Sequence, residues 1–251
     1  MYTLVQGSRA NIRKLFTHDI VYASFWLAII IVFFFFPVML GWQSLAEAVP
    51  TFYSHPSPNP SVKTLWQVDG GWHTIDIIPL IKAEIHMIKA GIPPLWTPYS
   101  GGGEPQLVSN AVNIYYPLRL VFFLVWNSTH AFDWYFILRF FIAGLGMFFY
   151  LRIIGLRRIV ALWGGIAYAF TGYFILYLTY PFLDIDSLLP WTLWAIERYW
   201  RGRNVRSAAL IGFFLAMTIV IGQPQSTIIA FLFASLYFVW RAVVHPQLRP
   251  T

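Results

Sequence analysis

The chain has 251 residues, of which 58% are hydrophobic, 20% aromatic and only 11% charged, with a mean hydropathy of +0.62. A soluble domain carries roughly 25% charged residues, so this composition predicts a membrane protein and excludes a disordered chain, a coiled coil and a disulfide scaffold. The chain has no cysteine, which excludes thiol catalysis and cysteine metal sites, and its net charge of +7 must be explained.

Uncharged stretches long enough to cross a hydrocarbon core of roughly 30 Å recur along the sequence. The stretch 207–240 is too long for one crossing and carries Gly222-Gln223-Pro224-Gln225 at its middle, which predicts a hairpin of two short spans. The weakest candidate is 187–200, because Glu197 and Arg198 lie near one end. We therefore predict one multi-pass membrane domain over residues 1–251, with spans at about 20–42, 132–153, 159–180, 187–200, 207–222 and 225–242.

The distribution of charge predicts the orientation in the membrane. Placing both termini and the turns at 157–158 and 201–206 on one side gathers twelve of the 17 basic residues there. The positive-inside rule makes that side the cytoplasm, and eight of the ten acidic residues then fall outside or at the outer boundary. The basic pI is therefore a signal of topology, and we expect no nucleic-acid partner.

The predicted outer loop, about residues 43–130, holds two segments suited to the membrane interface. Residues 76–90 place isoleucines at helical spacing and lysines on another face, which predicts an amphipathic helix. Residues 115–126 are apolar but short, and they include a proline and Arg119, which favours an interfacial or re-entrant piece. The predicted fold is an all-α membrane protein with about six transmembrane helices and a long first outer loop carrying interfacial helices.

Between these two segments the loop is dense in proline, glycine and aromatic residues. It reads Gly91-Ile92-Pro93-Pro94-Leu95-Trp96-Thr97-Pro98-Tyr99, and Gly102-Gly103-Glu104-Pro105 follows shortly after. Such a stretch cannot be a helix interior. The rings of Trp96 and Tyr99 beside the glycines suit a rigid surface for a lipid or a sugar; a structured linker that holds the interfacial helix down is the alternative.

These motifs carry a resemblance to a known family. The block 91–99, the Gly102-Gly103-Glu104-Pro105 motif and Tyr115-Tyr116-Pro117-Leu118 resemble the G-x-x-PLW-x-P-Y, GG-x-P and Y-P-L pattern of YfhO-type bacterial multi-pass membrane proteins. Leu189-Pro190-Trp191 and the glycine-containing turn at 222–225 also look similar, so the resemblance covers about residues 20–240. Ser109-Asn110-Ala111 departs from an N-P-Q-like triplet. Family members are usually much longer, so the chain resembles an N-terminal portion.

The resemblance implies the glycosyltransferase architecture called GT-C. Its members use a polyprenyl-phosphate sugar at the outer face of the membrane and place a catalytic acid in the first outer loop. The resemblance therefore implies an enzyme of the bacterial cytoplasmic membrane that transfers a hexose from a polyprenyl-phosphate donor to a surface glycopolymer or lipid of the cell envelope. Its implied partners are membrane lipid and the polyprenyl-phosphate sugar.

Two aspartates of the outer loop are candidates for the catalytic base. Transfer to a hydroxyl needs a base for the acceptor's proton, and the departing phosphate needs positive charge or a metal. Asp76 stands at the start of the predicted helix, similar to the loop aspartate of GT-C enzymes, and helix capping is its alternative role. Asp69 precedes two glycines, where a turn is the alternative. Trp72 occupies the place where many family members carry their acid, so both candidates stay open.

A second acidic pair, Asp184 and Asp186, lies in the predicted outer turn at about 180–187. If the turn is extended, this spacing puts both carboxylates on one side. The pair then predicts a site for a divalent cation such as Mg²⁺ or Mn²⁺ that holds the donor phosphate. Two solvated turn residues are the alternative.

Further polar and aromatic residues are predicted to bind the substrate. Arg139 lies inside the span 132–153, where an ionisable residue is a functional candidate, and snorkelling to the outer headgroups is an equal alternative. Lys82 is a candidate for contact with either the donor phosphate or lipid headgroups. The motif-bearing loop adds three residues expected to contact substrate: Trp96, Tyr99 and Glu104.

Two functions of other classes stay open. A transporter or flippase of lipid-linked sugar would carry ionisable groups at mid-membrane and broken helices in repeated halves. The sequence offers one mid-span arginine and no detectable repeat, which favours the enzyme. A membrane assembly partner without chemistry of its own is the other alternative.

Overall fold

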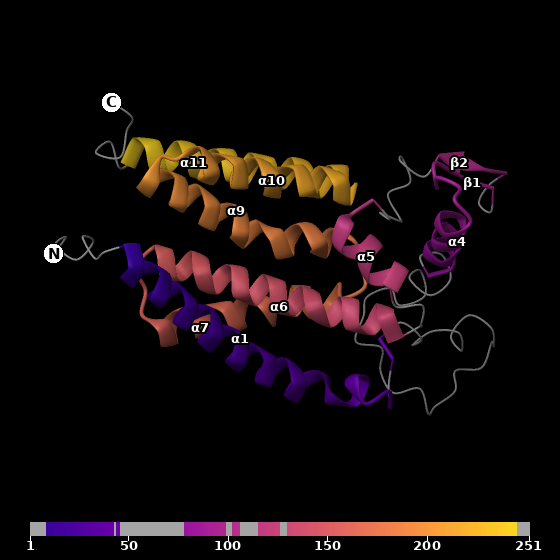
Figure 1. Ribbon diagram of the computed structural model, residues 1–251, viewed down its shortest axis with the longest axis horizontal. Coiled ribbons are helices and arrows are strands. Elements are labelled where there is room, and N and C mark those ends of the chain that lie inside the picture. Colours follow the sequence, from indigo (N-terminus) through magenta and orange to yellow (C-terminus); the bar gives the residue numbers. More distant parts are fainter. Residues whose placement is uncertain are drawn as a thin grey trace.

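The structure, a computed structural model, describes residues 9–42, 44–45, 78–98, 102–105, 115–125 and 130–244. Within these ranges the chain forms an elongated helical bundle (Figure 1). The helices along its long axis are α1 (Arg9–Met39), α6 (His130–Ile153), α7 (Arg158–Ala169), α9 (Phe182–Gly202), α10 (Val205–Ile221) and α11 (Pro224–Val244).

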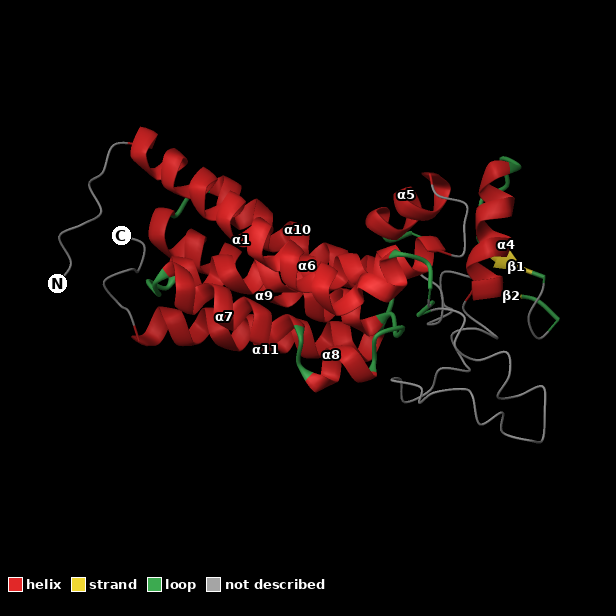
Figure 2. Ribbon diagram, turned by 90° about the horizontal axis from the view of Figure 1, so that it is seen from below, coloured by secondary structure: helices red, strands yellow, loops and turns green. Residues whose placement is uncertain are grey.

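The outer-loop segments gather at one end of this bundle. They form α4 (Ile78–Lys89), α5 (Pro117–Val125) and an antiparallel pair of two-residue strands, β1 (Trp96–Thr97) and β2 (Glu104–Pro105). Both views place these elements at the end opposite to the start of α1 and the end of α11 (Figures 1 and 2). The bundle therefore has one end built of loop elements and one end where the described chain begins and finishes.

Four helical segments of the described chain are long and apolar enough to cross a membrane. They are His18–Met39, Ala131–Ile153, Arg158–Leu176 and Pro224–Val244. These segments agree with four of the predicted spans and make the chain a membrane protein by length and composition. Helix α10 is apolar but has only 17 residues, and α9 is more polar than the four, so the predicted total of six spans stays a prediction.

The outward surfaces of α1 and α11 are apolar. Phe33 on α1 is 81% exposed, and Ile228 and Leu232 on α11 are exposed as well. Monomeric soluble proteins rarely expose large contiguous apolar patches, whereas a helix that faces lipid is apolar toward its surroundings. These faces are therefore suited to contact with hydrocarbon.

Local sequence explains where the later helices begin and end. Gly222 takes the left-handed conformation (φ 75°) and ends α10, and Pro224 begins α11, a position where a missing N–H costs nothing. The predicted hairpin is therefore present as two helices. The predicted segment 159–180 is interrupted, because Thr171 caps a separate short helix, α8 (Gly172–Leu176), by accepting a hydrogen bond from the Phe174 amide (3.4 Å).

Helix α6 lies at the centre of the bundle and packs against α1, α7 and α9. Two glycines allow close helix contact: a Cβ added at Gly165 of α7 would lie 2.6 Å from the Gly144 carbonyl oxygen of α6. A Cβ added at Gly146 would lie 2.6 Å from the ring of Trp191 on α9. Small residues at helix contacts let backbones approach closely, which is how helices associate in lipid.

We expect Gly165→Val to lower the free energy of unfolding by about 1–3 kcal/mol, because its side chain would collide with backbone of α6 that cannot move aside. Gly212→Val on α10 is the matched control, since Gly212 is exposed and a Cβ there meets nothing within 4 Å. Denaturant unfolding of the purified protein in detergent, followed by tryptophan fluorescence, measures both. Equal stability of the two variants would contradict the close α6–α7 contact.

Buried acids join helices at the end of the bundle remote from α4. Asp19 of α1 accepts from Arg152 of α6 (2.8 Å) and also pairs with Arg158 of α7. Glu197 of α9 is fully buried and pairs with Arg241 of α11 (2.5 Å). Because each carboxylate has a cationic partner, these pairs are structural links between helices.

Candidate functional site

The candidate site lies where α4 and α5 meet the ends of α6 and α9. Helix α4 is amphipathic as predicted: Ile81 and Ile85 are buried, and Lys82 is exposed. Helix α5 begins at Pro117, whose fixed φ suits a first helical position. Its nine residues are too short to cross a membrane, and its place at the interface stays a prediction.

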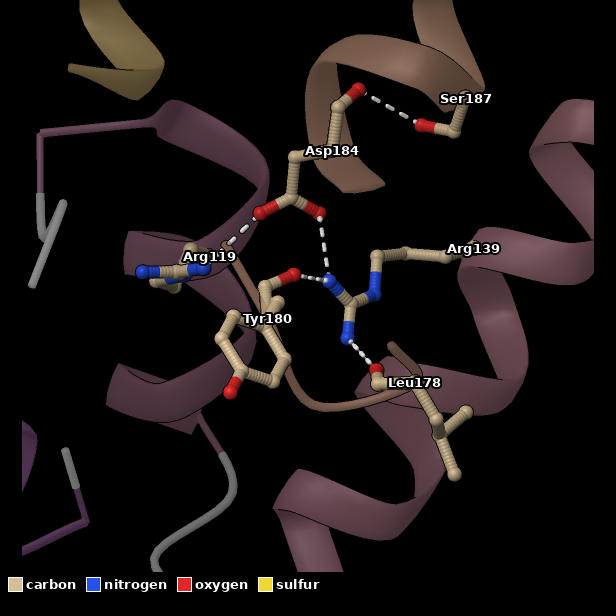
Figure 3. A network of polar contacts seen from close by, with 6 residues as sticks. All are labelled: Arg119, Arg139, Leu178, Tyr180, Asp184 and Ser187. Atoms are coloured by element: carbon tan, nitrogen blue, oxygen red, sulfur yellow. Dashed lines mark hydrogen bonds and ion pairs between the residues drawn. The ribbon is translucent and has the colours of Figure 1, made fainter. Parts of the chain in front are cut away.

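A buried cluster of two arginines and one aspartate joins three helices (Figure 3). Asp184, at the start of α9, accepts a hydrogen bond from Arg119 Nη2 of α5 (2.8 Å). Its other oxygen lies 3.7 Å from Arg139 Nη1 of α6. Arg139 also donates to the carbonyl oxygens of Tyr180 (2.7 Å) and Leu178, and so fixes the chain that leads into α9.

The cluster is enclosed by aromatic rings and shielded from water. Arg119, Arg139 and Asp184 are each at most 3% exposed. The Tyr135 ring centroid lies 5.4 Å from the guanidinium carbons of both arginines, and the Phe136 ring lies 4.7 Å from that of Arg139. Aromatic faces attract cations, more strongly where water is excluded. The rings therefore help to hold two like charges close together.

The cluster carries more positive charge than its single aspartate can balance. Arg119 Nε and Nη1 and Arg139 Nε have no hydrogen-bond partner among the described residues. The Tyr135 hydroxyl interacts with Arg119 electrostatically and through a side-chain hydrogen bond whose geometry falls short of a regular one. Buried donors are almost always paired. These unpaired guanidinium groups make the cluster suited to binding an anion.

Glu84 of α4 is a buried acid within electrostatic range of Arg119. It is 1% exposed, and neither carboxylate oxygen has a hydrogen-bond partner within the described chain. Burial raises the pKa of Glu84 to about 8, and the positive charge of Arg119 offsets part of that effect. The pKa of Tyr115 is raised by burial and by the Glu84 charge. Glu84 is therefore largely protonated at neutral pH.

An apolar pocket of about 350 Å³ lies between the end of α4 and α5. Its lining comes from the end of α4, the glycine–proline motif and α5: Ile88, Gly91, Ile92, Pro93, Pro94, Tyr115 and Leu120. The Tyr115 hydroxyl donates to the Pro94 carbonyl oxygen (2.8 Å). This hydrogen bond joins two of the sequence motifs into one wall of the pocket.

The predicted substrate residues are dispersed. Trp96 is half exposed on β1, where its ring packs over Gly103, a residue with φ +110°. Glu104 lies on β2, paired with Thr97, and Lys82 points to solvent on α4. Asp69, Asp76 and Tyr99 lie outside the described residues.

Arg139 is the predicted substrate residue that the fold brings into the cluster. It is 1% exposed and hydrogen-bonded to backbone, so snorkelling to outer headgroups does not describe it. Asp133, six residues earlier, accepts instead from the Leu45 amide (2.7 Å) and the Ser44 hydroxyl (3.1 Å). Asp133 and Arg139 therefore take part in separate sets of hydrogen bonds.

The expected extended turn at Asp184 and Asp186 is wrong, because both residues belong to α9. Residues two apart on a helix do not face each other. Asp184 is held by two arginines, whereas Asp186 accepts from the Tyr173 hydroxyl (3.0 Å). Two guanidinium groups repel a divalent cation, so this donor set does not fit Mg²⁺ or Mn²⁺. No group of three or more metal-ligating side chains occurs in the described part of the chain.

The sequence reading did not select Arg119 and Glu84 as site residues. In the sequence, the charge of Arg119 argues only against a membrane span. A charge within an apolar segment is itself a functional signal, because burying it requires a partner. Glu84 falls on the apolar face of α4, between Ile81 and Ile85, and an acid at such a position carries the same signal.

Comparisons with known protein families, with curated proteins and with solved structures find no match for this chain.

Proposed function

We propose that the protein is an outer-face glycosyltransferase of the bacterial cytoplasmic membrane. It moves a hexose from a polyprenyl-phosphate donor to a surface glycopolymer or lipid of the cell envelope. The observation that carries this proposal is that the same end of the bundle holds the buried cluster of Arg119, Arg139 and Asp184, with its surplus positive charge, and an apolar pocket lined by α4 and α5. A polyprenyl phosphate has the same two parts, an anionic head and an apolar chain.

The arrangement of charge along the bundle supports the proposed orientation. In this orientation α9 and α10 complete six crossings, and α4 and α5 lie in the outer interface. Basic residues such as Arg152, Arg158 and Arg241 belong to the end that also holds the start of α1 and the end of α11 (Figure 1). The positive-inside rule makes that end cytoplasmic. The arginine cluster and the pocket then lie at the outer end of the bundle, where lipid-linked donors meet external acceptors.

The proposed reaction is a displacement at the sugar's anomeric carbon. The bond from this carbon to the phosphate oxygen breaks, and a bond to the acceptor's hydroxyl oxygen forms. The acceptor's proton passes to a carboxylate, Asp76 or Asp69, and polyprenyl phosphate leaves with the bonding electron pair. The surplus charge of Arg119 stabilises the negative charge that grows on the departing phosphate.

If Asp76 or Asp69 is the base, its replacement by asparagine lowers the transfer rate about 10²–10⁴-fold, because no carboxylate then takes up the proton of the attacking hydroxyl. The measurement is hexose transfer by the purified protein in vesicles. Exchange of the other aspartate serves as the matched control, and it should leave the rate near that of the unchanged protein. Full activity of both single variants and of the double variant would remove these aspartates from the mechanism.

The function itself is tested with the unchanged full chain. Vesicles are loaded with polyprenyl-phosphate glucose, galactose or mannose, and a glycolipid and glycan extract of the bacterial envelope is supplied outside. Release of polyprenyl phosphate together with labelled product supports the proposal. Movement of intact donor across the vesicle membrane without release of polyprenyl phosphate identifies a flippase. If no donor is moved or cleaved, the protein does not have this chemistry. Either outcome overturns the proposal.

A further inference from the structure

The turn between α9 and α10 carries arginines that have no acidic partner. Arg201 lies in the last turn of α9, Arg203 ends that helix, and Arg206 lies in the first turn of α10. These three arginines form no ion pair with any described residue. The described acids at this end of the bundle, Asp19 and Glu197, pair with arginines of α6, α7 and α11. The positive charge of the turn is therefore left uncompensated by the described chain.

Arg203 has a backbone conformation that favours glycine. Its φ is 44°, the one positive φ at a non-glycine residue among those described. Gly155 after α6 and Gly222 at the end of α10 take positive φ values at the corresponding places. A side chain is strained there, because its Cβ approaches the backbone too closely. Strain of this kind gathers at functional sites, so we looked for a function of the Arg203 side chain.

The side chain of Arg203 offers a hydrogen-bond donor that the described chain does not use. Its guanidinium carbon lies 5.6 Å from the ring centroid of Trp200, which is 5% exposed. Arg203 Nη2 and Trp200 Nε1 have no hydrogen-bond partner among the described residues. Buried donors are almost always paired. These donors therefore indicate an acceptor from outside the described chain.

The turn lies at the level where a candidate membrane span ends. Glu197 near the end of α9 is paired with Arg241 near the end of α11, so the two helix ends lie side by side (Figure 1). Helix α11 is long and apolar enough to cross a membrane. At the end of a span the surroundings change from hydrocarbon to lipid headgroups. Acceptors available to the turn therefore include headgroup phosphates.

We propose that the α9–α10 turn binds the phosphate of an anionic phospholipid headgroup, with Arg203 as the central donor and Arg201 and Arg206 on either side. Arginine suits this role, because its planar guanidinium presents several N–H groups to phosphate oxygens. Arg201 and Arg206 are exposed and Arg203 is partly exposed, so a headgroup at the surface can reach them. Each arginine near a membrane surface strengthens the attraction to anionic lipid about fivefold.

This lipid site is distinct from the Arg119 cluster, which lies at the opposite end of α9. It does not depend on sugar transfer. In the orientation proposed above, the lipid belongs to the cytoplasmic leaflet. The site differs from a general preference for positive charge on that side, because it needs particular arginines in one turn.

Lipid binding is measured on the full-length protein in detergent by native mass spectrometry. The protein is titrated with phosphatidylglycerol, and separately with phosphatidylcholine and with glycerol phosphate. We expect phosphatidylglycerol to bind at least about fivefold more tightly than phosphatidylcholine, which has no net charge. Equal binding of the two lipids would overturn the proposal. Glycerol phosphate that binds as tightly as phosphatidylglycerol would assign the turn to a soluble phosphate and overturn the lipid assignment.

Arg203→Gly is the decisive variant, because it separates stability from binding. Glycine relieves the strain at this position, so the midpoint of denaturant unfolding should stay the same or rise. The affinity for phosphatidylglycerol should nevertheless fall about fivefold. Arg203→Gln, which keeps a side chain and removes the charge, should lower this affinity by a similar factor.

Arg157→Gln is the matched control. Arg157 is an exposed arginine just before α7, at the same end of the bundle, and its exchange removes the same charge. The affinity for phosphatidylglycerol should be retained in this variant. An equal fall in Arg157→Gln and Arg203→Gln would show a general effect of charge and overturn the site. Unchanged affinity in both Arg203 variants would overturn it as well, as would a lower unfolding midpoint of Arg203→Gly, which would make Arg203 a structural residue.

Discussion

Asp184→Asn is expected to lower the free energy of unfolding by about 3–5 kcal/mol, the largest loss of stability among the substitutions considered. The substitution keeps the shape of the side chain but removes the only negative charge in contact with Arg119 and Arg139 among the described residues. Two buried guanidinium groups then repel each other without compensation. The contact of α5 with α6 and α9 should weaken first, because Arg119 is the link of α5 to Asp184.

Denaturant unfolding of purified protein in detergent measures this loss. Asp186→Asn is the matched control, since it makes the same chemical change two residues later. Asp186 is only partly buried and contacts the Tyr173 hydroxyl, which an amide oxygen can still accept from, so we expect a loss below about 1 kcal/mol. Equal losses in the two variants would show that the buried cluster contributes no special stability.

Among the described residues, the largest expected effect on activity is that of Arg119→Lys, which should lower the rate of sugar transfer about 10²-fold or more. Lysine keeps a positive charge for Asp184, but its single ammonium cannot also present the free Nε and Nη1 donors of arginine. The departing phosphate would lose the donors that stabilise its growing charge. Because the charge is retained, the free energy of unfolding should fall less than in Asp184→Asn.

The control for this variant is Arg198→Lys, the same exchange on an exposed residue of α9 that lies over the Trp194 ring. It is near the end of the bundle remote from α5, so we expect its transfer rate to be unchanged. A folded Arg119→Lys protein with full transfer activity would separate the arginine cluster from the reaction.

The helices that could be predicted are those whose positions depend on local pattern. An uncharged stretch predicts α1, an apolar stretch interrupted by Arg139 predicts α6, and a glycine followed shortly by a proline predicts the hairpin of α10 and α11. The break at Thr171 was missed, because the apolar run continues through it and hydropathy does not register a capping hydroxyl. The extended turn at Asp184 was wrong, because α9 begins earlier than its hydropathy indicates.

The candidate site was harder to predict because its members are far apart in the chain. Arg139 could be selected by its place in a span, but its partner Asp184 lies 45 residues away and Arg119 comes from a loop helix. Rules based on sequence spacing identify residues that are neighbours on the same helix or strand, and they do not predict contacts between different elements. Glu84 lies on a helix whose amphipathic pattern was recognised, yet its unpaired state depends on what α5 presents to it.

The sequence by itself determined that this is a membrane protein, where its most apolar helices run and that an amphipathic helix follows the first of them. Those properties depend on hydropathy and helical periodicity, which are local and additive. Only the tertiary structure decided which charges meet. Whether a buried Asp184 binds a cation or balances two arginines depends on the groups within a few ångströms of its oxygens. In a low-dielectric interior those few contacts dominate the energy, and only folding brings them together.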